Sequence, residues 1–465
     1  MDAALNLVRH SGNEALMRAV ELSLVAATAG VPFHVHAEGL RGTGKTTVMR
    51  AVRSLLPPIR RVRGCLYNCD PDRPHCPHHR DLEPGALHAL GEEWVPMPFL
   101  EIAHAAKVGT VVGTIDLARL VDPAQPAAAL LPGTIPRAHR GILFVDEVNR
   151  LVETAPELVD ILLDVMGTRP GRVQIEESGL PTVEMPVQVT VWAASNPDED
   201  PGPLEEVRRQ LSDRFDLTVY TDRPTDLAAI EQILALGEGA PAPLAPEAKR
   251  AFQESMLAAL VQLRAVELGA GMRGRIAELY SRFGLESLRA AQGLQHGMRL
   301  LAATRGQRLA GLDELAAIIP HVLRHRVEPE TLQKAVALVE SWRTGESGVR
   351  RPPVEVAAPP SPSTAVDPAV SESWLSRTLE GLRKNIVGAE VPPHLPPRQG
   401  ALFARVGDGS GPRGSAPSPA AAEEGSVNPL DPLDVPVVSP PRLARPIRLL
   451  PPEALLQTEE ELGRL

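Results

Sequence analysis

Short apolar runs alternate with segments of helical spacing through the first half of the chain. Residues 31–39, VPFHVHAEG, alternate apolar and polar positions and end in glycine, which predicts a strand that enters a tight loop. Residues 46–58, TTVMRAVRSLLPP, have the spacing of a helix, which Pro57 ends. Apolar runs at 141–151 and 187–197 predict further strands, and the spacing at 156–166 predicts a helix between them. This alternation predicts an α/β fold with a parallel sheet covered on both faces.

Helical patterns flank this α/β region. Apolar residues recur at helical spacing over residues 1–30, and Gly30 provides a stop. From about residue 243 to Gly345 the strand signals vanish, which predicts an all-helical domain, and beyond it the chain becomes rich in proline. We therefore predict an α/β domain over residues 1–238, a helical domain over 239–348, and a mostly disordered arm with one or two short helices over 349–465.

The composition is that of a soluble globular protein with an acidic balance. Hydrophobic residues make up 43% and charged residues 23% of the 465 residues, and the formal net charge is −10. Because a negative field repels nucleic acid and anionic membrane surfaces, we expect no nucleic-acid partner. No basic leader precedes an apolar stretch and no run of about 18 apolar residues occurs, which predicts a cytoplasmic chain without a membrane span.

A glycine-rich loop separates the first predicted strand from its helix. Residues 39–46, GLRGTGKT, match the P-loop pattern, in which successive backbone N–H groups turn inward on phosphate oxygens. Lys45 would reach the β- and γ-phosphates of a nucleotide, and Thr46 would bind Mg²⁺. The predicted ATP-binding set is Gly39, Gly42, Thr43, Gly44, Lys45, Thr46, Thr47 and Asp146.

Polar residues that fit ATP hydrolysis end two further strands. Asp146 and Glu147 follow the apolar run ILFV, so that Asp146 would complete the Mg²⁺ site and Glu147 would polarise the attacking water as a general base. Asn196 ends the next apolar strand, where its amide would orient that water. Because Asn before Pro is also a common turn signal, the assignment of Asn196 depends on the first two motifs.

The three cysteines all lie in an insertion at about residues 60–82. The spacing C-x3-C-x6-C-x2-H fits a tetrahedral zinc site. Its ligands would be Cys65, Cys69, Cys76 and His79. His75 and His78 compete with His79 for the fourth position. The alternative is three reduced structural thiols beside solvated histidines, since the spacing differs from the common C-x2-C.

The motifs and their order resemble those of the AAA+ ATPases, and more closely those of the magnesium chelatase I subunit. The resemblance covers roughly residues 10–345. Its motifs are VGTID at 112–116, LPG at 131–133, AHRGILFVDEVN at 138–149, SNP at 195–197 and RRQLSDRF at 208–215. It implies an AAA+ P-loop core, a helical lid and a homo-oligomeric, hexameric ring with ATP at the subunit boundaries.

The resemblance also implies roles for single residues. Asn196 would be sensor 1, Arg214 the arginine finger that reaches a neighbour's γ-phosphate, and Arg289 the sensor 2 of the lid. Together with Lys45 and Glu147 they form the expected catalytic set. Residues 167–190 resemble the β-hairpin insertion of that family. The cysteine pattern also resembles one in that family, which has a fourth cysteine where this chain has His79.

The function implied by the resemblance is a Mg-dependent ATPase motor that drives metal insertion into a tetrapyrrole through partner subunits. The alternative is a MoxR-like remodelling chaperone that acts on a von Willebrand A-domain protein, because this chain carries no tetrapyrrole chemistry of its own. The expected partner is accordingly an A-domain protein or a chelatase D-like subunit. An intact nucleotide site and the lack of a DxSxS segment favour an I-like motor over a D-like scaffold, with the arm as a tether for that partner.

Overall fold

All residues that the computed structural model describes belong to one compact unit, Met1–Pro392. The described residues are 7–103, 105–115, 130–167, 169–176, 182–196, 205–238 and 246–345. The predictions for residues 1–6, for 239–245 and for the arm at 349–465 lie outside them.

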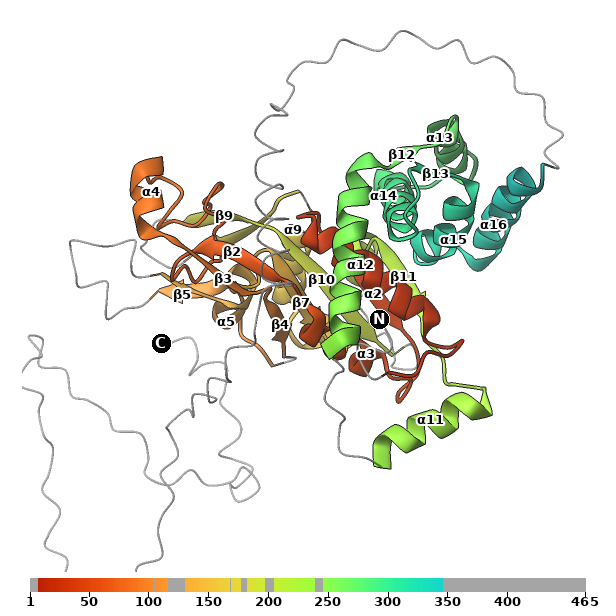
Figure 1. Cartoon of the computed structure of the whole chain (residues 1–465), viewed down its shortest axis with the longest axis horizontal. Helices are drawn as coiled ribbons and strands as arrows, with labels where there is room; N and C mark the ends of the chain where they lie inside the picture. Colours follow the sequence, from red (N-terminus) through yellow and green to blue (C-terminus); the bar gives the residue numbers. More distant parts are fainter. Residues whose placement is uncertain are drawn as a thin grey trace, which may run out of the picture. The chain divides into compact units, whose positions relative to one another are not determined.

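A five-stranded sheet forms the centre of this unit (Figure 1). Its strands are β1 (Val35–Glu38), β4 (Phe99–Ile102), β7 (Gly141–Val145), β10 (Val189–Ser195) and β11 (Leu217–Tyr220). Their order is β11-β1-β10-β7-β4, and every neighbouring pair is parallel. The predicted α/β fold class with a parallel sheet is therefore confirmed.

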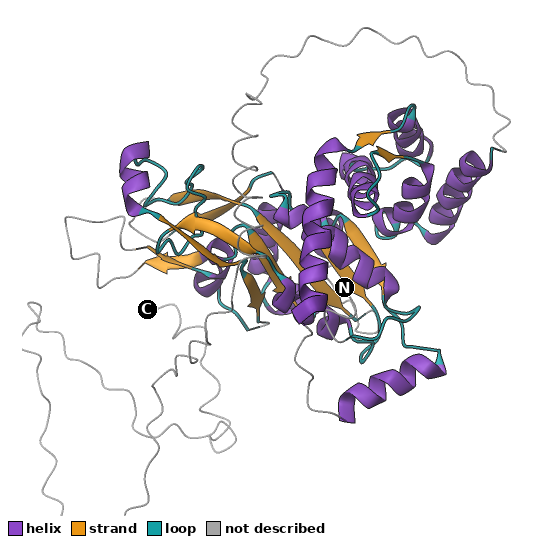
Figure 2. Ribbon diagram, viewed as in Figure 1, coloured by secondary structure: helices purple, strands orange, loops and turns teal. Residues whose placement is uncertain are grey.

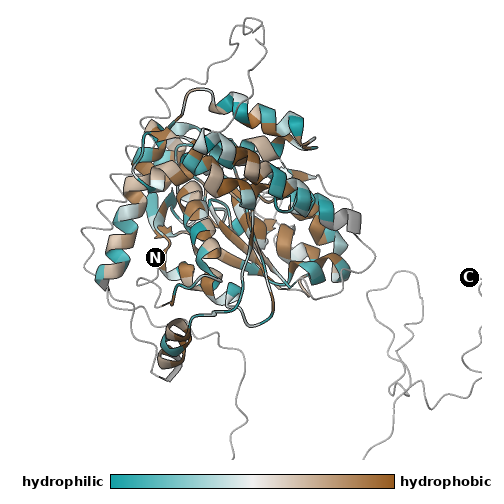
Figure 3. Ribbon diagram, turned by 90° about the vertical axis from the view of Figure 1, so that its right-hand side faces the viewer, coloured by the Kyte–Doolittle hydropathy of each residue, from teal (hydrophilic) through white to brown (hydrophobic). Residues whose placement is uncertain are grey.

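Helices cover both faces of this sheet. Along β7, Ile142 and Phe144 join one hydrophobic core, whereas Leu143 and Val145 join the other, because successive side chains of a strand point to opposite faces. The first core includes side chains of α2 (Glu14–Thr28) and α3 (Lys45–Ala51), and the second includes those of α8 (Val148–Thr154) and α9 (Pro156–Gly167). Burial on both sides explains why β7 and β10 are apolar along most of their length, and the strands at the centre of Figure 3 are mostly brown.

The first helix is shorter than the sequence predicts. α2 begins at Glu14, and residues 7–13 contain no helix. The side chain of Asn13 accepts a hydrogen bond from the His10 N–H at 3.0 Å and donates one to the Val8 carbonyl at 2.9 Å. Local side-chain bonds of this kind offer the backbone an alternative to helix. The prediction of helix is therefore wrong for residues 7–13.

The domain after the sheet is helical, as predicted, apart from one short pair of strands. Its helices are α12 (Pro246–Ala265), α13 (Met272–Arg282), α14 (Leu288–Thr304), α15 (Leu312–Leu323) and α16 (Pro329–Thr344). Its hydrophobic core is continuous with the one that covers the α2 face of the sheet. The strands β12 (Glu267–Leu268) and β13 (Leu309–Ala310) pair in parallel, and each is too short to leave a pattern in the sequence.

Two-stranded sheets extend the α/β core (Figure 2). The antiparallel pair of β2 (Pro58–Val62) and β3 (Glu92–Pro96) frames the cysteine loop. β8 (Gly171–Ile175) pairs antiparallel with β9 (Val183–Val187) where the hairpin insertion is expected, although residues 177–181 lie outside the described residues. The remaining elements are η1 (Val52–Leu55), α4 (Pro84–Leu90), α5 (Val108–Val112), β5 (Gly113–Ile115), β6 (Leu130–Pro132), α7 (Thr134–Arg137), α10 (Glu205–Arg214) and α11 (Leu227–Glu238).

Candidate active site

The glycine-rich loop connects the end of β1 to the start of α3. Gly39 passes so close to the end of β11 that a Cβ there would lie 2.1 Å from the Thr221 carbonyl oxygen. Gly44, directly before α3, has a φ of 82°, in the left-handed region that glycine adopts without a steric penalty. A Cβ at Gly44 would meet no other atom within 4 Å. The loop thus has the backbone freedom and open space that a phosphate-binding loop needs.

The ammonium group of Lys45 lies inside this loop. Its Nζ donates hydrogen bonds to the carbonyl oxygens of Gly39, at 2.5 Å, and Leu40, at 2.7 Å. Only 8% of Lys45 is exposed, and a buried ammonium requires partners of this kind. The loop therefore holds one positive charge at its centre.

Thr46 on α3 and Asp146 at the end of β7 are in direct contact. The Thr46 hydroxyl donates a hydrogen bond to Asp146 Oδ1 at 3.1 Å. Arg50, one turn further along α3, donates to Asp146 Oδ2 at 3.3 Å and pairs with Glu101 at 2.9 Å. A hydroxyl beside a carboxylate supplies the oxygen ligands that Mg²⁺ prefers. Arg50 is not among the residues expected from the sequence, because an arginine on a helix carries no distinguishing signal.

Glu147 has an uncommon backbone conformation for a residue other than glycine. Its φ of 49° and ψ of 52° lie in the left-handed region, which costs about 1–3 kcal/mol and is concentrated at functional sites. Its carboxylate pairs with Arg150 at 3.0 Å. This conformation lies in the two-residue turn between β7 and α8.

Asn196 lies directly after β10 and is buried. Its carbonyl oxygen accepts a hydrogen bond from Asn149 Nδ2 at 3.3 Å, which ties the end of β10 to α8. The preceding residue, Ser195, has its hydroxyl 2.8 Å from His36 Nε2 on β1. The sequence offered no signal for this contact, because its two residues are far apart along the chain.

One cavity of about 240 Å³ collects these side chains. It is lined by Arg41, Gly42, Thr43, Gly44, Lys45, Thr46, Thr47, Asp146, Glu147, Ala194, Ser195 and Asn196. The predicted nucleotide-binding residues are therefore brought together, with Gly39 supporting the loop from the end of β1.

Arg214 and Arg289 lie at a different cavity, of about 470 Å³, which shares no lining residue with the first. Arg289, in the first turn of α14, donates hydrogen bonds to the carbonyl oxygens of Met166, at 3.2 Å, and Gly167 at the end of α9. The guanidinium of Arg214, the last residue of α10, has no hydrogen-bond or ion-pair partner among the described residues. Burial lowers the pKa of the Arg289 guanidinium, and the positive charge of Arg214 lowers it further. This cavity therefore has room and positive charge for an anion.

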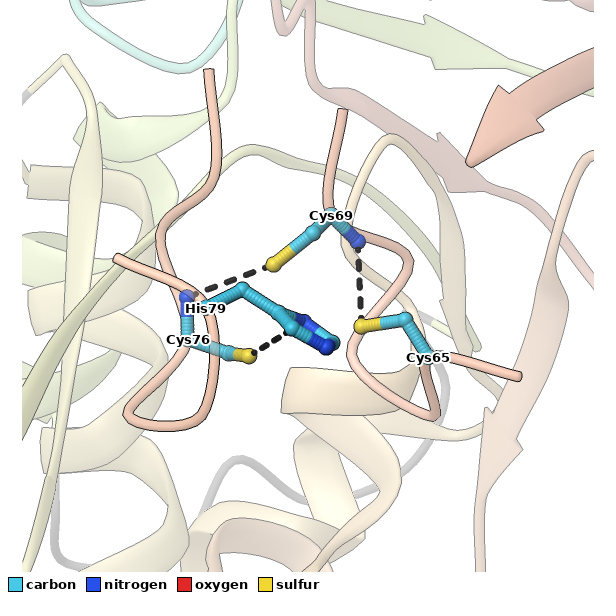
Figure 4. A group of neighbouring side chains, drawn as sticks. All are labelled: Cys65, Cys69, Cys76 and His79. Atoms are coloured by element: carbon cyan, nitrogen blue, oxygen red, sulfur yellow. Dashed lines mark hydrogen bonds between the residues drawn. The ribbon is translucent and has the colours of Figure 1, made fainter. Parts of the chain in front are cut away.

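Three cysteines and a histidine converge in the loop between β2 and α4 (Figure 4). The ligand atoms of Cys65, Cys69, Cys76 and His79 all lie within 4.8 Å of one another. The cysteines are buried free thiols. The backbone N–H of Cys69 donates to Cys65 Sγ at 3.5 Å, and that of Cys76 donates to Cys69 Sγ at 3.3 Å. These N–H···S contacts hold the sulfur atoms toward a common centre.

The three thiols interact strongly with one another. The pKa of Cys65 is lowered, because Cys69 and Cys76 donate hydrogen bonds to its sulfur. For the same reason the pKa of Cys69 is raised to about 11, and that of Cys76 is raised as well. A divalent cation favours thiolates over thiols, so that it would replace the protons that the sulfur atoms share.

His79 is the histidine that joins this group. Its Nδ1 lies 3.2 Å from Cys76 Sγ. The His75 ring stacks on His139, with ring centroids 3.7 Å apart, although its Nδ1 is also 3.3 Å from a cysteine sulfur. The ring of His78 packs beside a tyrosine. Burial lowers the pKa of His75 to about 4, so that its imidazole is neutral.

Known proteins match this chain over much of its length. A family model described as AAA lid domain matches residues 258–342. The magnesium-chelatase 38 kDa subunit of Acidiphilium rubrum is 33% identical over 334 residues, which cover 70% of this chain and 92% of that protein. The chain belongs to the magnesium chelatase I-subunit family of AAA+ ATPases.

A second member of this chelatase family matches over a similar length. The magnesium-chelatase 38 kDa subunit of Cereibacter sphaeroides is 30% identical over 338 residues, covering 70% of this chain and 92% of that protein. A cryo-EM-based structure of the complex between subunits BchI and BchD of magnesium chelatase matches at 25% identity, covering 72% of this chain and 99% of that chain. Its TM-score of 0.37 is too low to carry an argument.

Membership of this chelatase family defines the class of activity. The chain is an AAA+ ATP hydrolase whose nucleotide is ATP and whose metal cofactor is Mg²⁺. The AAA+ core and helical lid that the resemblance implied are likewise confirmed. Within the described part of the chain, no helix combines the length and the apolar character needed to cross a bilayer.

Proposed function

We propose that the cavity between the ends of β1, β7 and β10 binds and hydrolyses Mg-ATP. The observation that carries this proposal is that the P-loop, the Thr46–Asp146 pair and the strained Glu147 all line one cavity. Thr46 and Asp146 would hold Mg²⁺, which when bound neutralises charge on the phosphates. Lys45 and the backbone of Gly42 to Thr47 would bind the phosphates themselves.

In this proposal Glu147 is the general base. Its carboxylate would accept a proton from the attacking water, while the side-chain amide of Asn196 would hold that water in line with the γ-phosphate. Both residues line the cavity from adjacent parallel strands, β7 and β10. In this assignment the two neighbouring acids have different roles, Asp146 at the metal ion and Glu147 at the water.

We predict that substitutions at Lys45 and Glu147 separate ATP binding from turnover. Lys45→Ala should abolish tight Mg-ATP binding, whereas Glu147→Gln should bind ATP normally and lose turnover by about 10²-fold or more, as expected for loss of a general base. Binding is measured with a fluorescent ATP analogue and turnover by phosphate release. Glu157→Gln, an exposed acid on α9, is the matched control and should retain activity. Unchanged turnover in Glu147→Gln would remove this residue from the mechanism.

We further propose that Arg214 and Arg289 complete the active site of a neighbouring subunit in a homo-oligomeric, hexameric ring. Both arginines line a cavity other than the one that holds the P-loop. The guanidinium groups of Arg214 and Arg289 lie close enough for their positive charges to interact. A γ-phosphate that approaches from another protomer would stabilise both of them. An arginine finger of this kind contributes roughly 10³–10⁵ to the rate.

Mixing inactive variants tests this arrangement. Arg214→Ala and Lys45→Ala, each inactive alone, should regain part of the ATPase activity when combined, because some interfaces then join an intact Lys45 to an intact Arg214. Recovery should rise with protein concentration, since rings must form. Mixed oligomers that assemble, as measured by light scattering, and remain inactive would contradict the assignment of Arg214 to a neighbour's site.

We propose that Cys65, Cys69, Cys76 and His79 bind one structural zinc ion. Three soft sulfur atoms and one imidazole nitrogen within 4.8 Å of each other form a closed donor set of the kind that zinc prefers. All three thiols are buried, which fits a structural site better than a catalytic one. The ion would tie the loop between β2 and β3 into the α/β core.

We expect about one zinc ion per chain in freshly purified protein, measured by elemental analysis. Cys69→Ser should lose the metal and lower the melting temperature, because metal-binding energy is also folding energy. His78→Ala is the control, since this ring lies outside the ligand group, and it should keep the zinc. Native protein with far less than one zinc per chain would rule the site out.

The work that ATP hydrolysis drives is proposed from the relatives. The two relatives described above are named as magnesium-chelatase subunits, and on this basis we propose that this chain drives metal insertion into a tetrapyrrole through a chelatase D-like partner. The second candidate, MoxR-like remodelling of a von Willebrand A-domain protein, requires the same ATPase site. It differs from the first in the partner.

Trapping the partner separates these two functions. In its own cell, Glu147→Gln with ATP should retain a D-like chelatase subunit, identified by mass spectrometry, and Lys45→Ala should not. With that partner and the remaining chelatase subunit, the wild-type chain should form magnesium tetrapyrrole, detected by fluorescence. An A-domain partner with no chelatase sequence and no metal insertion would support the remodelling function instead.

A further inference from the structure

The turn that follows α15 in the lid contacts the end of the helix that carries Arg214. Arg326 in this turn is buried, with 6% of its side chain exposed. Its Nε donates to Asp213 Oδ1 at 3.1 Å, and its Nη2 donates to the carbonyl oxygens of Asp213, at 2.9 Å, and Phe215, at 2.7 Å. The Nη1 group donates to Val322 O within the lid at 2.5 Å. The guanidinium therefore joins the lid to the residues on either side of Arg214.

These acceptors lie where a helix needs partners. α10 ends at Arg214, and the last carbonyl groups of a helix have no N–H donor within the helix. Arg326 supplies donors to two carbonyl groups in this stretch, and His325, whose Nε2 lies 3.1 Å from the Phe215 carbonyl oxygen, adds a contact to one of them. Phe215 is itself fixed, because its ring is buried and stacks on His36 at 5.1 Å.

Arg214 has no comparable support for its own side chain. Its guanidinium has no hydrogen-bond or ion-pair partner in the part of the chain that the structure describes. The direction in which it leaves α10 is thus set mainly by the backbone at residues 213–215. That backbone is the part of α10 that Arg326 holds.

We propose that Arg326 is a positioning residue that fixes the end of α10 and so directs Arg214 toward the nucleotide of the neighbouring subunit. The inference rests on the proposed role of Arg214 in a neighbour's site. Arg326 itself touches neither nucleotide nor reacting atoms. Its loss should leave ATP binding in its own subunit intact and impair hydrolysis in the next one.

The test begins with Arg326→Gln and Arg326→Lys. Both should keep normal ATP affinity and form oligomers, and turnover should fall by roughly 10²-fold, the effect of a misplacement of about 1 Å in a catalytic group. Arg326→Lys keeps the charge but loses the planar fork that spans several acceptors at once. Arg343→Gln is the control, because it removes a lid arginine whose partners, Asp313 and Glu340, also lie in the lid. The control should retain turnover.

Mixing experiments then identify which subunit carries the defect. Arg326→Gln combined with Lys45→Ala should regain activity, because the Lys45→Ala subunit supplies a correctly held Arg214 to an intact P-loop. Arg326→Gln combined with Arg214→Ala should stay inactive, because every interface then lacks a positioned finger. A general folding defect would not produce this pairing.

Three outcomes would overturn the proposal. One is recovery in the Arg326→Gln and Arg214→Ala mixture. Another is that the Arg326→Gln and Lys45→Ala mixture stays inactive while the Arg214→Ala and Lys45→Ala mixture recovers activity. That result would contradict the role of Arg326 and leave the proposed function of Arg214 intact. The third is a loss of ATP affinity in Arg326→Lys in proportion to its turnover, which would make Arg326 merely structural. If the Arg214→Ala and Lys45→Ala mixture fails as well, the role of Arg214 in a neighbour's site is what fails, and this inference fails with it.

Discussion

The register of three parallel strands is the constraint on which the site depends. Glu38 on β1 pairs with Ser195 on β10, and Ala193 on β10 pairs with Val145 on β7. Because the strands run in the same direction, the residues that follow them emerge at one edge of the sheet. The P-loop, the pair of acids and Asn196 therefore meet although they are far apart along the chain. The apolar side chains on the two faces of these strands also fill the two cores, so that folding and assembly of the site share one cause.

The site combines a buried charge with a strained backbone. A buried ammonium at Lys45 is held by backbone carbonyl groups, and Glu147 keeps a left-handed backbone. Both features are costly alone and persist because the surrounding sheet fixes the chain on either side. The Thr46–Asp146 contact links the start of α3 to the end of β7, which is separated from β1 by β10. The loop that holds Lys45 and the turn that holds Glu147 are therefore connected directly.

The elements that could be predicted from the sequence are those with a local pattern of residues. The strands β7 and β10 were predictable from their apolar runs, and β1 from its alternation before a glycine-rich loop. The P-loop was predictable because it needs glycine at fixed positions. The start of α2 was not, since Asn13 acts through bonds to two nearby residues that periodicity cannot reveal. The spacing pointed to His79 but left His75 and His78 as rivals, and only the structure shows which ring lies in the group. The contact of Arg50 with Asp146 and the bond between His36 and Ser195 depend on tertiary packing and leave no trace in residue spacing.

The lid connects two parts of the molecule that serve different proposed sites. Arg324 pairs with Glu38 at 3.3 Å, and Glu38 directly precedes the P-loop. Two residues later, Arg326 pairs with Asp213, which directly precedes Arg214. Both contacts come from one turn after α15, too short to move at one end and stay still at the other. A displacement of this turn therefore acts on the nucleotide loop of its own subunit and on the arginine proposed to serve the next. In a ring, each lid would then bear on two adjacent active sites through the ion pairs of this one turn.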